Sequence, residues 1–84
     1  MFTLSPDPAR IHSSIRIDFN EHLTDDAVLT ICNCKGQLVK TLVCKAGSSF
    51  IKFTVDNKGI YTVNYRNSIK TYKKWLDVRH PNDI

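Results

Sequence analysis

The sequence predicts an all-β fold, an antiparallel β-sandwich of about six to seven short strands. Apolar side chains alternate with polar ones over several short stretches, as they do in half-buried strands. Turn residues interrupt these stretches after roughly eight to twelve residues. No apolar stripe keeps the spacing of a helix over as many as about eleven residues. With 84 residues, the chain is expected to form a single domain over 1–84.

The first half of the chain contains two clear strand patterns. Residues 1–10 are predicted to be irregular and extended, because Pro6 and Pro8 exclude a helix. Residues 11–20 alternate between polar and apolar side chains, which indicates a half-buried strand. After a polar turn, residues 27–34 are rich in β-forming residues and predict a second strand.

Two turn glycines separate the next strands. Gly36 is expected to supply the positive φ of a hairpin turn. The strand at 37–45 does not alternate strictly, so it is either covered on both faces or bulged. Gly47 marks the following turn, and residues 50–55 alternate again.

The last two strands are predicted over 60–65 and 69–78, with a polar tail over 79–84. Alternation places one set of side chains toward the core: Tyr61, Val63, Tyr65, Tyr72, Lys74, Leu76 and Val78. Trp75 falls on the opposite face from Tyr72. Packing in the core or at an edge is therefore favoured for the tyrosines over a platform that stacks ligands.

Charge and hydropathy limit the possible partners. The net charge is +4, but the basic residues are spread along the chain, so no nucleic-acid footprint is expected. No window approaches the roughly 18 consecutive apolar residues of a membrane span, so no transmembrane segment is predicted. No signal peptide is recognised at the start. The chain is thus either cytosolic or a piece of a longer precursor with an upstream signal.

No pattern of catalytic or metal-binding residues stands out, so no catalytic residue, metal or cofactor is predicted. Cys32, Cys34 and Cys44 are odd in number, which argues against a complete disulfide framework. Their thiol state is left open, with buried apolar thiols favoured. The Cys-x-Cys pair with Cys44 and a histidine could hold zinc, although the usual Cys-x2-Cys spacing is missing.

Four pieces of sequence in a fixed order carry a family resemblance. They are Leu4-Ser5-Pro6-Asp7-Pro8-Ala9, Asn33-Cys34-Lys35-Gly36-Gln37-Leu38-Val39, Lys58-Gly59-Ile60-Tyr61 and Tyr72-Lys73-Lys74-Trp75-Leu76-Asp77-Val78. Together they resemble the C-terminal sorting domain of Bacteroidetes proteins exported by the type IX secretion system. Related small immunoglobulin-like domains share much of this pattern.

The resemblance implies an immunoglobulin-like sandwich at the end of a larger passenger protein. The protein export machinery at the outer membrane would recognise it, a transpeptidase-like sortase would remove it, and the passenger would be attached to a surface lipopolysaccharide. The passenger would then be secreted or held at the outer-membrane surface. By the same resemblance, Gly59, Tyr61, Lys73 and Lys74 belong to the sorting motif, and the domain has no active site.

Two other functions stay open at this stage. The first is a free-standing immunoglobulin-like binding or adhesion module that uses an edge strand or a loop. The second is a cysteine-based zinc or redox protein. A sorting domain should be required for export, a binding module should act alone on a partner, and a metal protein should lose stability with a chelator.

Overall fold

The computed structural model describes residues 2–20 and 22–80, and within them every regular element is a strand. The strands are β1 (Phe2–Ser5), β2 (Ala9–Arg10), β3 (Ile15–Phe19), β4 (Ala27–Cys32), β5 (Leu38–Cys44), β6 (Phe50–Phe53), β7 (Gly59–Arg66) and β8 (Thr71–Arg79). The predicted all-β class is confirmed, with two more short strands at the start than the sequence indicated.

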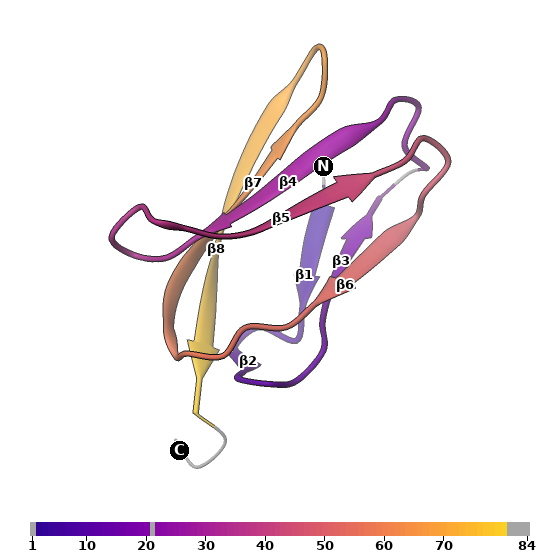
Figure 1. The fold of residues 1–84 in the computed structure, drawn as a ribbon. Coiled ribbons are helices and arrows are strands. Elements are labelled where there is room, and N and C mark those ends of the chain that lie inside the picture. Colours follow the sequence, from indigo (N-terminus) through magenta and orange to yellow (C-terminus); the bar gives the residue numbers. More distant parts are fainter. Residues whose placement is uncertain (1, 21, 81–84) are drawn as a thin grey trace.

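The strands form two sheets that face each other (Figure 1). One sheet has three strands in the order β1-β3-β6, and the other has five in the order β2-β8-β7-β4-β5. All neighbours are antiparallel except β2, which lies parallel to β8. This arrangement is an immunoglobulin-like β-sandwich. The order of the strands could not be read from the sequence.

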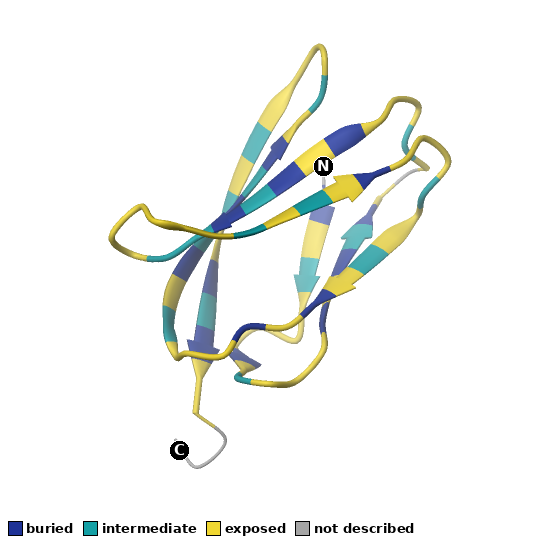
Figure 2. Ribbon diagram, in the orientation of Figure 1, coloured by how far each residue is buried: buried dark blue, intermediate teal, exposed yellow. Residues whose placement is uncertain are grey.

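The core lies between the two sheets and follows the period of two along the strands (Figure 2). Its largest fully buried side chains come from both sheets: Phe2, Ile15, Ile17, Leu29, Ile31, Val63, Leu76 and Val78. All but Phe2 lie in stretches that the alternation predicted to be strands. Burial on one side of each strand leaves the other side of both sheets facing solvent.

The start of the chain is extended over the described residues 2–10, as predicted, but it is not irregular. Phe2 to Ser5 pair with β3, with Phe2 opposite Phe19, and Ala9 and Arg10 pair with β8. Pro6 and Pro8 lie between the two strands, where a missing N–H removes no bond from a ladder. The prolines therefore separate two short strands.

The two alternatives for the strand after Gly36 are now decided in favour of a bulge. Ile31 pairs with Lys40, but the next residue, Cys32, pairs with Leu38, so Val39 is the extra residue of β5. The other end of the chain extends beyond the prediction, because β8 continues to Arg79. Most of the predicted polar tail lies outside the described residues.

Candidate functional site

The β7–β8 hairpin carries all four predicted recognition residues, but it separates them along its length. Gly59 pairs with Val78 at one end, while Lys73 pairs with Asn64 further along. Val78 and Lys73 are five residues apart on β8, which corresponds to about 17 Å. Tyr61 lies near Gly59, and Lys74 follows Lys73. The four residues therefore form two groups rather than one cluster.

Gly59 is required by its backbone conformation. Its φ is +147°, a value that residues with a side chain rarely adopt. An added Cβ would meet no atom within 4 Å, so space around the residue is not the constraint. Gly59 thus allows the chain to turn from the preceding loop into β7.

Tyr61 anchors the same loop through its hydroxyl group. The ring is only 4% exposed, and the hydroxyl donates a hydrogen bond to the backbone carbonyl of Asn57, four residues upstream. This geometry resembles the tyrosine corner of immunoglobulin-like sandwiches. Burial raises the pKa of Tyr61, and the nearby Asp56 and Cys34 raise it further. The conformation of the loop therefore depends on a neutral phenol.

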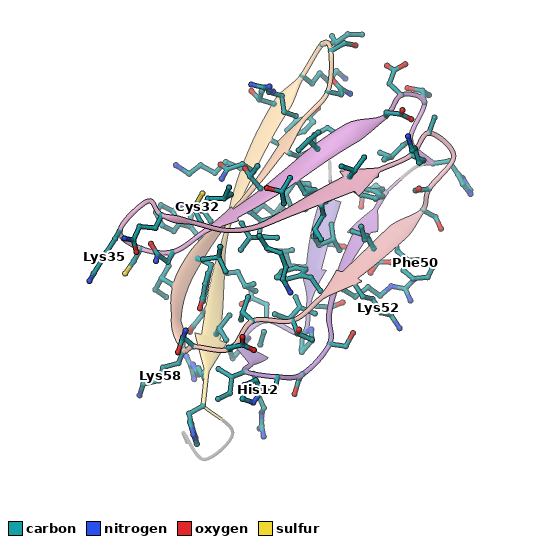
Figure 3. All side chains as sticks on the ribbon, viewed as in Figure 1. His12, Cys32, Lys35, Phe50, Lys52 and Lys58 are labelled. Atoms are coloured by element: carbon teal, nitrogen blue, oxygen red, sulfur yellow. The ribbon has the colours of Figure 1, made fainter. Side chains whose placement is uncertain are left out.

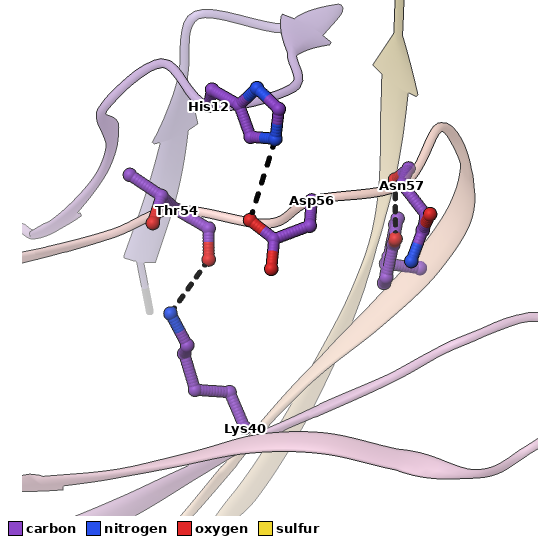
Figure 4. A network of polar contacts seen from close by, with 6 residues as sticks. His12, Lys40, Thr54, Asp56 and Asn57 are labelled. Atoms are coloured by element: carbon purple, nitrogen blue, oxygen red, sulfur yellow. Dashed lines mark hydrogen bonds and ion pairs between the residues drawn. The ribbon is translucent and has the colours of Figure 1, made fainter.

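Further polar contacts tie this end of the sandwich together (Figure 4). Lys40 Nζ, on edge strand β5, donates to the Thr54 carbonyl oxygen at 2.8 Å and so joins the five-stranded sheet to the chain after β6. The His12 N–H donates to the Val55 carbonyl at 2.9 Å. The His12–Asp56 ion pair is long, at 3.6 Å, and exposed, so it contributes little. The contacts at this end hold the fold together.

The two predicted lysines lie on opposite faces of β8. Lys74 is half-buried, with its Nζ 5.8 Å from the centroid of the Phe2 ring inside the sandwich. Lys73 is exposed, with its Nζ 5.3 Å from the centroid of the Trp75 ring. Of the four predicted residues, only Lys73 projects a side chain from the outer face of the five-stranded sheet.

Trp75 is the main residue that the predicted motif omitted. It is 62% exposed on the outer face of β8, the side of the strand that the alternation predicted. Neighbouring strands place three side chains beside it in one row: Trp75 pairs with Thr62, Thr62 with Cys32, and Cys32 with Leu38. The sequence could have indicated this residue, because the alternation places a tryptophan on the face of the strand that points away from the core.

The turn glycines lie outside these two groups. Gly36 has a φ of +80° and lies in the turn between β4 and β5, whereas Gly47 has a φ of +92° and lies between β5 and β6. The Asn33 side chain supports the first turn, since its Oδ1 accepts hydrogen bonds from the N–H groups of Lys35 and Gln37 at 2.9 and 3.0 Å.

The three cysteines do not come together. All are free thiols: Cys34 is exposed, Cys32 is half-buried and Cys44 is buried. Burial raises the pKa of the Cys44 thiol, which lowers its reactivity as a nucleophile near neutral pH. Over residues 2–20 and 22–80, no three His, Cys, Asp or Glu side chains are grouped so that they could hold a metal ion.

The fold and the hairpin define a small immunoglobulin-like module with a buried tyrosine corner and an exposed aromatic–basic face. Comparison with protein families gives a match to the secretion system C-terminal sorting domain over residues 4–78. The chain therefore belongs to the family of type IX secretion C-terminal sorting domains, which its sequence motifs resemble. No curated protein and no solved structure matches the chain.

Family membership indicates a sorting signal, a role that is generally non-catalytic. It also implies a precursor that is secreted or carried at the cell surface. None of the described residues belongs to a helix of the length and apolarity needed to cross a membrane.

Proposed function

We propose that the type IX export machinery recognises this domain as a folded β-sandwich and exports a passenger protein linked to it in cis. The family match carries this proposal, because it covers residues 4–78 and hence nearly the whole described sandwich. A short linear signal would need only a few of these strands. The passenger is then released outside the cell or retained at the outer-membrane surface.

The four residues of the sorting motif contribute to this function in different ways. Gly59 and Tyr61 act through the fold, since they shape the loop before β7. Lys73 acts by direct contact with the machinery, since its ammonium group is exposed beside Trp75. Lys74 packs near Phe2 and supports β8 from the inner side. The domain itself performs no chemical reaction.

A passenger-fusion experiment tests this function. Residues 1–84 are placed after a signal peptide and a fluorescent passenger in a bacterium with an active type IX system. The whole segment is used because Phe2 is fully buried in the core. Fluorescence is measured in the periplasm, at the cell surface and in the medium, beside a passenger that lacks the domain.

Surface or medium fluorescence that depends on the domain is the expected result. Substituting Lys73→Ala and Lys74→Ala together should return the passenger to the periplasm, whereas Lys45→Ala with Lys52→Ala, which removes the same charge, should not. A folded, unaltered fusion that stays in the periplasm contradicts the proposal. In that case a free-standing binding module, which the exposed Trp75 also favours, becomes the leading function.

A further inference from the structure

We propose that the outer face of the five-stranded sheet is the surface on which the export machinery docks, with Trp75 as the anchor. This inference rests on the proposed function and adds to it a surface and a partner chemistry. The partner is a protein surface that brings carboxylate groups to the groove and apolar side chains to either side of it.

Exposed apolar side chains gather on this sheet. Of the eight large apolar side chains that are exposed among the described residues, six belong to β4, β5, β7 and β8. They are Val28, Leu38, Val39, Val43, Ile60 and Trp75. These side chains supply the apolar contacts that a partner on this sheet would meet.

The pairing of the strands arranges these side chains around a polar centre. Val28 and Val43 are directly opposite each other toward one end of the sheet, while Trp75 lies in the row that ends at Leu38. Between them a groove crosses β4, β7 and β8, and its lining includes Thr30, Asn64 and Lys73. The Asn64 amide donates only long bonds of 3.4 Å, so a partner could redirect it at little cost.

The charge on this face indicates an acidic partner. The outer side chains of β4, β7 and β8 include three cations, Arg66, Lys73 and Arg79, and a single carboxylate, Asp77. Arg79 already binds Asp77, with 3.0 Å between Nη2 and Oδ2. Arg66 and Lys73 therefore leave positive charge along the groove, and both line it.

An exposed tryptophan next to these cations fits the composition of a binding hot spot. Tryptophan and arginine carry a large share of the binding energy in protein interfaces, usually near the centre of the contact. Trp75 offers a large flat ring that needs little ordering on binding, and the cations fix the direction of approach. A polysaccharide would also stack on Trp75, but the valine and leucine side chains on the same face favour a protein.

The other sheet provides matched controls. Phe50 and Lys52 on β6 repeat the geometry of Trp75 and Lys73 on β8, because the Lys52 Nζ lies 5.9 Å from the Phe50 ring centroid. Phe50 and Lys52 lie on β6 of the three-stranded sheet (Figure 3). Phe50→Ala and Lys52→Glu therefore remove the same kinds of group from the other sheet. Purified variants are first compared by thermal unfolding, so that only folded domains enter the comparison.

The test measures export of the fluorescent fusion for four single variants. Trp75→Ala and Lys73→Glu should lower the exported fraction, by about tenfold or more for Trp75→Ala, which corresponds to a loss of about 1.4 kcal/mol or more in binding free energy. Phe50→Ala and Lys52→Glu should change export by less than about twofold. Should Trp75→Ala fold poorly, Lys73→Glu decides, because it changes only an exposed side chain.

A competition measurement checks that the surface acts in recognition. The domain without a passenger, sent to the periplasm, should reduce export of the unaltered fusion, and the same domain with Trp75→Ala should not. If the unaltered fusion is never exported, the proposed function fails. If it is exported and all four variants are exported equally, the docking surface is overturned and the function stands. Trp75-dependent binding to a soluble acidic polysaccharide with unchanged export would also overturn it.

Discussion

The outer faces of the two sheets carry the same pair of residue types in different surroundings. On β6, Phe50 and Lys52 lie two residues apart, and on β8, Lys73 and Trp75 do the same. Phe50 also has the Arg16 guanidinium carbon 4.0 Å from its ring centroid. Arg16 in turn binds Asp18, with 2.7 Å between Nε and Oδ1.

The comparison shows how one sheet covers its exposed aromatic ring while the other presents it. Arg16 and Lys52 both lie near the Phe50 ring, which is 45% exposed. Trp75 is 62% exposed and has Lys73 beside it on a wide sheet with further apolar side chains. Trp75, with one ammonium group beside it, is therefore more available for binding than Phe50, which has the Arg16 guanidinium directly over its ring.

The largest expected effect tests whether the two faces belong to one cooperative unit. Ile17→Ala on β3 and Leu76→Ala on β8 each remove a fully buried side chain, one from each sheet. Each should lower the free energy of unfolding by about 3 kcal/mol, because a cavity is left in a shared core. Urea denaturation gives both values, and Thr3→Ala at an exposed position of β1 is the control. A negligible loss for either core variant would mean that its sheet does not contribute to the common core.

Gly59→Ala should have the next largest effect. A φ of +147° strains any residue with a Cβ, so the unfolding free energy should fall by about 1 to 3 kcal/mol. Export of a fusion that remains folded should persist, since the outer faces are unchanged. The control is Ala46→Gly, next to Gly47 in an exposed turn. Loss of export from a domain with unaltered unfolding would instead make Gly59 part of the contact.

Tyr61→Phe should cost about 1 kcal/mol, because it removes the hydrogen bond to the Asn57 carbonyl and leaves the ring in place. A loss of stability on Tyr61→Phe would show that the Tyr61 hydroxyl stabilises the fold. Thermal unfolding measures the loss, and Tyr65→Phe is the control, since its hydroxyl makes a longer contact of 3.3 Å with Asn67. A larger loss for Tyr65→Phe would contradict the tyrosine-corner assignment.

Because the pKa of Tyr61 is raised in the folded state, the stability of the domain should depend on pH. A neutral phenol is favoured in the folded state, so its contribution is complete below the ordinary pKa of 10.0 and is lost as the pH rises above it. The Cys44 thiol behaves in the same way above its ordinary value of 9.0. Unfolding measured from pH 7 to 11 should show falling stability at the alkaline end, and Tyr61→Phe should reduce that fall. A pH profile unaffected by the substitution would assign the alkaline loss to other groups.

Arg16→Ala should have the smallest effect on stability. The guanidinium packs over an exposed ring and pairs with a half-exposed carboxylate, so the expected loss is about 0.5 to 1 kcal/mol. Phe50 should become more exposed, and fluorescence of a dye that binds apolar surface should rise slightly. Lys52→Ala, whose ammonium group lies further from the ring, is the matched control. Equal changes in stability and dye fluorescence for both variants would show that Arg16 does not shield Phe50 more than Lys52 does.

The buried side of strands with clear alternation was predicted correctly from the sequence. In β3, β4 and β7 the alternating side chains named the buried face correctly, as with Ile17, Leu29 and Val63. The segment of Phe2 was missed because its pattern is short and its pairing partner, Phe19, is distant in the sequence. Long-range pairing of this kind leaves no local signal when prolines follow directly.

The predicted sorting motif also shows what the sequence could predict and what only the structure could show. The resemblance predicts one motif of Gly59, Tyr61, Lys73 and Lys74, and the family match covers the stretch that contains them, residues 4–78. The structure gives two of them positions that shape a loop and puts the two lysines on opposite faces of β8. Neighbours in a motif can therefore have different tasks, because alternate residues of a strand face opposite sides.

The sequence by itself determined the all-β class, the inner side of most strands and the family, since alternation and short ordered motifs are local properties of the chain. Only the tertiary structure decided which strands share a sheet, that residues 2–10 join both sheets, and that Phe50 is covered while Trp75 is presented. These outcomes depend on contacts between residues far apart in the chain, such as Arg16 with Phe50, which no local pattern encodes.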